Sequence, residues 1–192
     1  MRRLSREAWI EGALRMLDAG PEGGLSIERL ARQLGVTRGS FYHHFSARKA
    51  LVAALLERWE DTHTRQVIRQ ACEVADGPQR LRAWVEAVVA LPKGREVALR
   101  RWADRDSAVR ASLERVERER RGFVHTLTRM LAPEATDALI DRLARFGYLA
   151  FIGLQQSSPR DPAALERFAD DWLALVQANA CPDAPCGGGE GS

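Results

Sequence analysis

The feature that most constrains this chain is one short stretch, Thr37-Arg38-Gly39-Ser40-Phe41-Tyr42-His43-His44-Phe45. Phe41 and Phe45 are one helical turn apart, so they share a face that can pack on a core. Most of the other side chains can hydrogen-bond to a phosphate or to the edge of a base. Thr37 is a residue type that favours the N-cap, and it predicts that a helix begins there. The stretch therefore predicts a short helix with one buried face and one polar face.

A second short helix is predicted immediately upstream, between Ser26 and Gly35. Ser26 can cap its start, and Gly35 can end it in the left-handed conformation that glycine tolerates. The apolar residues between them recur at helical spacing: Ile27, Leu30, Ala31 and Leu34. Two short helices joined by a glycine-containing turn, the second rich in polar side chains, indicate a helix-turn-helix.

The charge distribution agrees with this motif. No Asp or Glu lies between Glu28 and Glu57, and that interval holds Arg29, Arg32, Arg38, Arg48 and Lys49. Residues 1–60 carry ten Lys or Arg and seven Asp or Glu, whereas residues 61–192 carry nineteen of each. A basic run alone is often only a solvated helix face. Its coincidence with the motif favours a surface that binds a polyanion.

The block from Ser26 to Leu51 resembles the DNA-binding domain of TetR/AcrR-family transcriptional repressors. The resemblance rests on Phe41-Tyr42-His43-His44-Phe45 and on the residues that follow it, Ser46-Ala47-Arg48-Lys49-Ala50-Leu51. Arg48 stands where the family usually has Lys, so the positive charge is kept and a phosphate contact is still expected. The match covers about the first sixty residues of the chain.

This resemblance implies that the helix from Thr37 to His44 lies in the major groove of DNA. Arg38 is the candidate for a bidentate contact with guanine. Gly39 would let the helix approach closely, Ser40 can contact any base, and the Tyr42 ring can meet a thymine methyl group. Phosphate contacts are expected from Ser26, His43, His44, Arg48 and, more weakly, Lys49. The candidate DNA-binding residues are therefore Ser26, Thr37, Arg38, Gly39, Ser40, Tyr42, His43, His44, Arg48 and Lys49.

The periodicity predicts an all-α chain of about nine helices, without strands or repeats. An N-terminal three-helix helix-turn-helix domain (residues 1–50) precedes a helical ligand-binding and dimerisation domain (residues 51–180). Residues 181–192, rich in Gly and Pro, are predicted to be a disordered tail. Outside the helix-turn-helix, the expected helices cover about residues 5–18, 47–75 (capped by Ser46), 78–91, 96–103, 107–131, 134–156 and 163–178. Within them, the charged segment 115–121 is predicted to be a solvated helix with internal ion pairs.

The resemblance also implies a homodimer formed by the last two helices and a small-molecule site among the middle helices. The helix over residues 134–156 carries Gly147, Ala150 and Gly153, small residues that allow close helix contact. The apolar stripes of these helices could instead fill the core of one protomer. The candidate effector-binding residues are Trp84, Trp102, Phe123, His125 and Tyr148. The same aromatic residues could be ordinary core, and their apolar character favours a hydrophobic or aromatic effector.

Other chemistries find little support in the sequence. It contains no Gly-x-Ser-x-Gly, no His-Glu-x-x-His and no phosphate-binding glycine loop, so no enzyme, cofactor or metal site is expected. His43 and His44 are neighbours, point about 100° apart on a helix and would not share a metal. Cys72, Cys181 and Cys186 lack metal-ligand spacing. With no signal peptide and no run of eighteen apolar residues, a cytoplasmic protein without a membrane anchor is predicted.

The sequence thus predicts a ligand-responsive repressor that binds a palindromic operator as a homodimer and is released by a small, apolar effector. Two alternatives remain open at this point. One is a constitutive DNA-binding regulator without a small-molecule switch. The other is a helical ligand-binding module or enzyme whose DNA-binding domain is vestigial.

Overall fold

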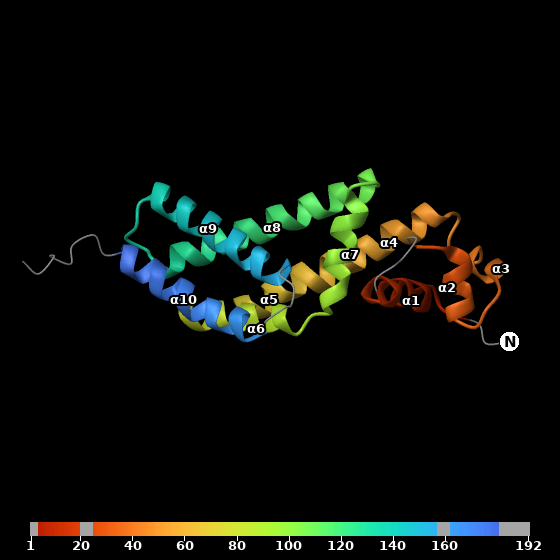
Figure 1. Cartoon of the computed structure of the whole chain (residues 1–192), viewed down its shortest axis with the longest axis horizontal. Coiled ribbons are helices and arrows are strands. Elements are labelled where there is room, and N and C mark those ends of the chain that lie inside the picture. Colours follow the sequence, from red (N-terminus) through yellow and green to blue (C-terminus); the bar gives the residue numbers. More distant parts are fainter. Residues whose placement is uncertain (1–3, 20–24, 157–161, 181–192) are drawn as a thin grey trace, which may run out of the picture. The chain divides into compact units, whose positions relative to one another are not determined.

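A computed structural model describes residues 4–19, 25–156 and 162–180, and all regular structure in these ranges is helical (Figure 1). The N-terminal elements are α1 (Arg6–Asp18), α2 (Ile27–Gln33), α3 (Arg38–Phe41), α4 (Arg48–Glu60), the π-helical segment η1 (Asp61–Arg65) and α5 (Gln66–Cys72). The others are α6 (Gly77–Val89), α7 (Lys93–Ala103), α8 (Ser107–Leu131), α9 (Asp137–Gln156) and α10 (Pro162–Ala180). Counted with α4, η1 and α5 as one continuous helix, the described ranges hold nine helices, which confirms the predicted all-α fold.

Local capping explains where the first helices begin and end. The Ser5 and Ser26 side chains accept hydrogen bonds from the backbone N–H groups of Ala8 and Arg29, so both serines cap as their residue type favours. Gly35 has a φ of 69°, the left-handed conformation expected of it at the turn between α2 and α3.

The predicted cap of the fourth helix was wrong by one residue. The N-cap of α4 is Ala47, not Ser46, and it makes no side-chain capping bond. Thr37 does occupy the N-cap of α3, but its hydroxyl makes no capping bond either. Helix α9 also begins at Asp137, three residues later than expected, after backbone bonds from Leu139 and Ile140 to Thr136. The Thr136 hydroxyl also accepts a hydrogen bond from the Leu139 N–H at 3.4 Å, so a polar residue caps α9 whereas none caps α4.

The described residues belong to two compact units, whose boundaries fall within α5 and α8. Unit 1 comprises residues 1–67 and 90–119, and unit 2 comprises residues 68–89 and 120–192. Unit 1 therefore groups α7 and the first half of α8 with the helix-turn-helix, a different division from the predicted domain limits at residue 50. The predicted tail, residues 181–192, lies outside the described ranges.

One hydrophobic core holds unit 1 together, and α1, α2 and α3 gather beside α4 (Figure 1). Trp9 and Phe41 are fully buried and meet edge to face, with ring centroids 5.4 Å apart. A bidentate ion pair joins α7 to the end of α1, because Arg95 donates to both carboxylate oxygens of Asp18 at 2.9 and 2.7 Å. A Cβ atom at Gly94 would lie 2.5 Å from the Asp18 carbonyl oxygen, so this close approach requires glycine.

The charged segment of α8 bonds to other helices, which the expectation of ion pairs within that helix did not include. Arg115 pairs with Glu60 of α4, and Glu119 pairs with Arg65 of η1. Glu117 accepts from Arg100 of α7 at 2.7 Å. A pattern of alternating charges cannot reveal that neighbouring helices bring partners of their own, and here those partners join α8 to the rest of unit 1.

Unit 2 is built around a chain of aromatic rings. The ring centroid of Trp84 in α6 lies 4.5 Å from that of Phe151 in α9. The Phe151 centroid lies 5.4 Å from that of Phe168 in α10. Helix α10 runs along both α6 and α9 (Figure 1). A Cβ atom at Gly147 would lie 2.5 Å from the Trp172 ring, so this glycine allows α9 and α10 to approach closely within one protomer.

Candidate nucleic-acid interface

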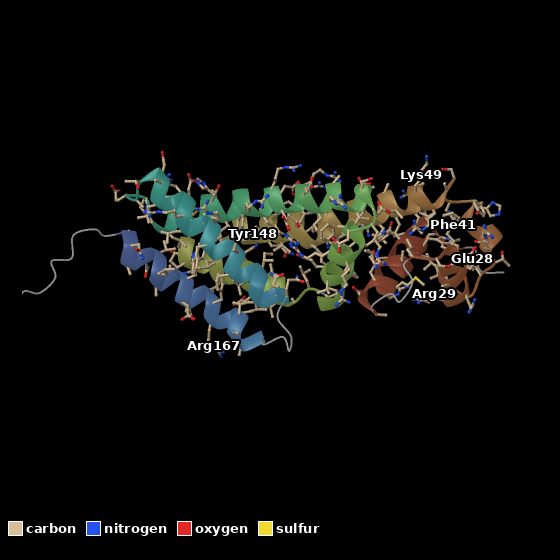
Figure 2. The ribbon with its side chains drawn as sticks, turned by 45° about the horizontal axis from the view of Figure 1, so that its top comes forward. Glu28, Arg29, Phe41, Lys49, Tyr148 and Arg167 are labelled. Atoms are coloured by element: carbon tan, nitrogen blue, oxygen red, sulfur yellow. The ribbon has the colours of Figure 1, made fainter. Side chains whose placement is uncertain are left out.

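Helix α3 has the two sides that its sequence predicts. Phe41 and Phe45 are 0% and 4% exposed and stack in the core of unit 1, with ring centroids 5.4 Å apart. Tyr42 is 51% exposed, a large fraction for an aromatic residue. Figure 2 shows Phe41 among the helices of this unit and Lys49 projecting from the first turn of α4. The buried side fixes the helix, and the other side presents polar groups to solvent.

Arg38 is an exposed cation of this surface, and two neighbouring side chains define its orientation. Its Nη2 donates to the Tyr42 hydroxyl at 3.3 Å, and its guanidinium lies 6.0 Å from the centre of the Tyr42 ring. Its Nη1 lies 3.2 Å from the Glu28 carboxylate, and the two side chains are 59% and 55% exposed. The hydrogen bond to Tyr42 and the charge of Glu28 raise the pKa of Arg38 above its ordinary value. The Arg38 guanidinium is therefore permanently charged, and Glu28 and Tyr42 fix its orientation.

Glu28 joins this surface although the sequence analysis did not select it. Its carboxylate accepts a hydrogen bond from the Ser26 hydroxyl at 3.0 Å and pairs with Arg38. Its own backbone N–H, the Ser26 hydroxyl and the Arg38 guanidinium lower the pKa of Glu28, so it is ionised at neutral pH. The signal in the sequence was its position as the single acidic residue among residues 28–56.

Arg48 has a structural role beside the phosphate contact expected of it. Its Nε donates to the Leu25 carbonyl oxygen at 2.9 Å, and its guanidinium lies 5.5 Å from the centre of the Trp102 ring. Lys49, the next residue, is exposed at the start of α4. The structure thus places two cations side by side in the chain, and Arg48 also connects α4 to the segment before α2 and to α7.

The remaining candidates lie on or beside α3, within unit 1. Thr37, Gly39 and His43 are exposed, and Ser40 and His44 are half-buried. A Cβ atom at Gly39 would meet only the Thr37 hydroxyl oxygen, at 3.7 Å, which is an ordinary contact. Nothing inside the protein therefore requires glycine at this position.

The five candidate effector-binding residues do not come together as one group. Trp84, Phe123 and Tyr148 are buried in unit 2, where Trp84 and Phe123 lie 5.8 Å apart. His125 is at the edge of the same unit and contacts Asp141 at 3.0 Å. Trp102 belongs to unit 1, beside Arg48. Phe151 and Phe168, which were not among the candidate residues, are central to the aromatic chain in unit 2.

Unit 2 also presents apolar side chains to solvent. Phe146 and Leu149 of α9 are 60% and 61% exposed, and Leu175 of α10 is 39% exposed. Gly153 continues the face of α9, and a Cβ atom there would meet nothing within 4 Å. Large residues exposed to this extent at helical spacing mark a surface suited to another protein.

The described ranges also bear on membrane and metal sites. No helix within them is long and apolar enough to span a bilayer. Within the same ranges, no three His, Cys, Asp or Glu side chains gather closely enough to hold a metal ion.

Comparison with known proteins finds its sequence matches over the helix-turn-helix segment. Residues 10–55 match the family described as bacterial regulatory proteins, tetR family. The chain is 48% identical over 58 residues to the class C tetracycline repressor protein of Escherichia coli. That match spans 30% of this chain and 26% of the repressor, so the chain covers about a quarter of that curated relative.

Solved structures show the same fold over nearly the whole chain. A putative transcriptional regulator from Pseudomonas aeruginosa PAO1 gives a TM-score of 0.72 at 20% identity, covering 93% of this chain and 94% of that one. A putative transcriptional regulator from Saccharomonospora viridis in complex with choline gives 0.74 at 17% identity, covering 88% and 95%. At identities of 20% and 17%, the likeness to these structures shows the fold alone.

Proposed function

We propose that this chain is a DNA-binding transcriptional regulator of the tetR type, a repressor that binds a palindromic operator as a homodimer and is released by a small effector. The observation that carries the proposal is the two-sided α3. Phe41 is fully buried while Arg38 and Tyr42 face solvent next to it, so the base-reading groups stand on a rigid support.

The operator contacts divide into two kinds. Arg38 reads a guanine through two hydrogen bonds, and Ser40 and Tyr42 contact neighbouring base edges or methyl groups. Ser26, His43, His44, Arg48 and Lys49 contact phosphates and fix the register. Thr37 and Gly39 border the groove, where the absence of a Cβ atom at Gly39 lets the backbone approach the bases.

The proposed dimer is supported by the exposed faces of α9 and α10. Phe146, Leu149 and Leu175 are apolar and exposed in a single protomer, and burial against a second copy would remove them from water. A symmetric dimer would present two copies of α3, and a palindromic site offers two half-sites about 34–36 Å apart. Symmetry in the protein therefore explains the proposed symmetry of the operator.

The proposed effector site is the aromatic part of unit 2. Trp84, Phe123 and Tyr148 lie there together with Phe151, and His125 borders them. Such rings favour an apolar or aromatic compound. Aromatic faces also attract quaternary ammonium groups, so choline, which is bound by the regulator from S. viridis, is a second effector to test.

The DNA-binding proposal is tested by selecting duplexes from random-sequence DNA with the parent protein. We expect an inverted repeat, and we expect Arg38→Ala to reduce the ratio of affinities for selected and scrambled duplexes by roughly five- to a hundredfold. Arg15→Ala, which removes an exposed arginine from α1, is the matched control and should leave this ratio unchanged. Selection of no preferred duplex would instead favour the alternative of a vestigial DNA-binding domain.

The effector proposal needs a separate experiment. Apolar aromatic compounds and choline are screened for release of the selected duplex, and the screen is repeated with Trp84→Leu and Trp102→Ala. We expect Trp84→Leu to alter release more than it alters DNA affinity without the compound. A change confined to Trp102→Ala would move the site to unit 1, and release by no compound would favour a constitutive regulator.

A further inference from the structure

The Glu28 carboxylate contacts two of the residues assigned to DNA. Its Oε2 accepts a hydrogen bond from the Ser26 hydroxyl at 3.0 Å, and its Oε1 lies 3.2 Å from Nη1 of Arg38. Figure 2 shows Glu28 on α2, which packs against α3. Residues 28–56 contain no other Asp or Glu, so this is the single negative charge that the segment brings to the proposed DNA surface.

We propose that Glu28 is a specificity-determining residue. It positions Arg38 to contact a guanine, and it neutralises the charge of Arg38 when the DNA has no guanine at that position. This inference rests on the proposed DNA-binding function. Glu28 itself is a positioning residue, because it acts through Arg38 rather than by contacting a base.

The first part of the argument concerns orientation. Glu28 holds Nη1 of Arg38, while the Tyr42 hydroxyl accepts a hydrogen bond from Nη2 at 3.3 Å. A long, exposed arginine side chain would otherwise sample many rotamers, and fixing it for a bidentate contact costs entropy. Two partners on different helices hold the guanidinium in place before DNA arrives. Loss of one partner should therefore weaken binding to the cognate sequence.

The second part of the argument concerns charge. Binding to DNA of any sequence is governed by the number of phosphates that the protein neutralises. An arginine paired with a carboxylate adds no net charge to that interaction. Because both side chains are more than half exposed, the ion pair is weak and a directed base contact can replace it. Removing Glu28 would free Arg38 to contact phosphates on every sequence.

The test compares Glu28→Gln, which preserves the shape of the side chain, with the parent. The probes are the duplex selected by the parent and a scrambled duplex of equal length and composition. We expect affinity for the scrambled duplex to rise about two- to fivefold, and its salt dependence to steepen by about one ion. Affinity for the selected duplex should rise less or fall, so the ratio of the two affinities decreases.

Two further variants separate this effect from a general effect of charge. Glu57→Gln removes an exposed carboxylate from α4 and should change both affinities by the same factor. In an Arg38→Ala background, Glu28→Gln should also change both equally, because the partner is gone. An equal rise for both duplexes in the parent background, or the same fall in ratio without Arg38, would overturn the inference.

The proposed function and this inference fail in different ways. If the parent selects no duplex, DNA recognition itself is refuted. If the parent discriminates and Arg38→Ala abolishes that discrimination, while Glu28→Gln leaves the ratio unchanged, then Glu28 is only a surface partner of Arg38. Circular dichroism of each variant verifies that the helical fold is intact.

Discussion

At the scale of single residues, α3 and its neighbours separate side chains that support the fold from side chains that face solvent. Phe41 and Phe45 are core residues, as their spacing predicts. Ser26 has a divided role, because its hydroxyl caps α2 and donates to Glu28 before any phosphate is present. A residue of the DNA surface can therefore contribute to stability and binding at once, and a useful substitution is one that changes only one of them.

Gly39 offers such a substitution. A Cβ atom there would make only an ordinary contact with the protein, and alanine favours a helix more than glycine does. We expect Gly39→Ala to leave the free energy of unfolding unchanged or to raise it by up to about 1 kcal/mol. If the backbone of α3 approaches the bases closely, the same variant should bind the selected duplex at least about tenfold more weakly, since the added methyl group occupies that space.

Urea unfolding and DNA titration of Gly39→Ala measure the two effects independently. Gly122→Ala is the control, because a Cβ atom at Gly122 would meet nothing within 4 Å and Gly122 lies on the part of α8 that belongs to unit 2. Full DNA affinity in Gly39→Ala would show that glycine is not needed for approach to the groove.

Arg48 permits a second separation of roles. Its hydrogen bond to Leu25 and its position over Trp102 need the planar guanidinium, whereas a phosphate contact needs only positive charge. We expect Arg48→Lys to lower the free energy of unfolding by about 1 kcal/mol and to keep the salt dependence of DNA binding. Arg48→Ala should lower stability similarly and also reduce the salt slope by about one ion, for all sequences alike.

The Arg48 prediction is checked by measuring DNA affinity between low and moderate salt for the selected and scrambled duplexes. An unchanged slope in Arg48→Ala would mean that the arginine serves only the fold. A change in which bases are preferred would mean that it reads sequence.

At the scale of elements, the most distinctive feature is the polar junction between α4 and η1. Glu60 is 4% exposed, yet its carboxylate accepts bonds from Ser112 at 2.6 Å, Arg115 at 2.5 Å and Arg65 at 3.1 Å. The π-helical turn follows directly at Asp61, and such turns occur mostly where a helix serves a function. This junction joins α4, which begins at the proposed DNA surface, to α8 through one buried charge.

Removing the charge of Glu60 should therefore destabilise unit 1. We expect Glu60→Gln to lower the free energy of unfolding by about 1–3 kcal/mol. The cost stays below that of a fully buried pair because Arg115 and Arg65 are 48% and 40% exposed and remain hydrated. Urea unfolding followed by tryptophan fluorescence measures the change. Glu57→Gln, on the exposed side of the same helix, should remain within about 0.5 kcal/mol of the parent.

These elements show what the sequence could and could not predict. Apolar spacing located nearly every helix, because burial of Trp9, Leu55 or Phe151 depends on positions along a single helix. The connecting helix is mostly polar between residues 60 and 70, yet Glu60 is buried there. Its partner Ser112 is 52 residues away, and no local pattern identifies which helix will cover a polar face.

The candidate sites divide in the same way. The positions on α3 could be predicted because they follow from one short motif and its resemblance to a family. Trp102 could not be separated from Trp84 by periodicity, since both are apolar positions on amphipathic helices. Its packing against the core of unit 1 and its contact with Arg48 place Trp102 in that unit. Residues grouped by chemical type alone can thus belong to different compact units.

At the scale of the whole molecule, the proposed dimer connects the exposed face of α9 to DNA affinity. In a symmetric interface, Phe146 and Leu149 meet their counterparts or close neighbours, so a charge introduced there is repeated by the partner. We expect the double variant Phe146→Glu, Leu149→Glu to be monomeric by sedimentation. A monomer engages one half-site at a time and loses the effective concentration of the second, so its affinity for the selected duplex should fall by about a hundredfold or more.

The matched control for that variant is Met130→Glu, which places the same charge at another exposed apolar residue, 37% exposed at the end of α8. Met130→Glu should have the same oligomeric state and the same affinity for the selected duplex as the parent. Binding to a duplex with a single half-site distinguishes dimer loss from damage to α3, because the monomeric double variant should bind that duplex as one parent subunit does. If the double variant remains a dimer, the interface uses another face. If it becomes monomeric but binds the full palindrome as tightly as the parent, the two half-sites are not read together.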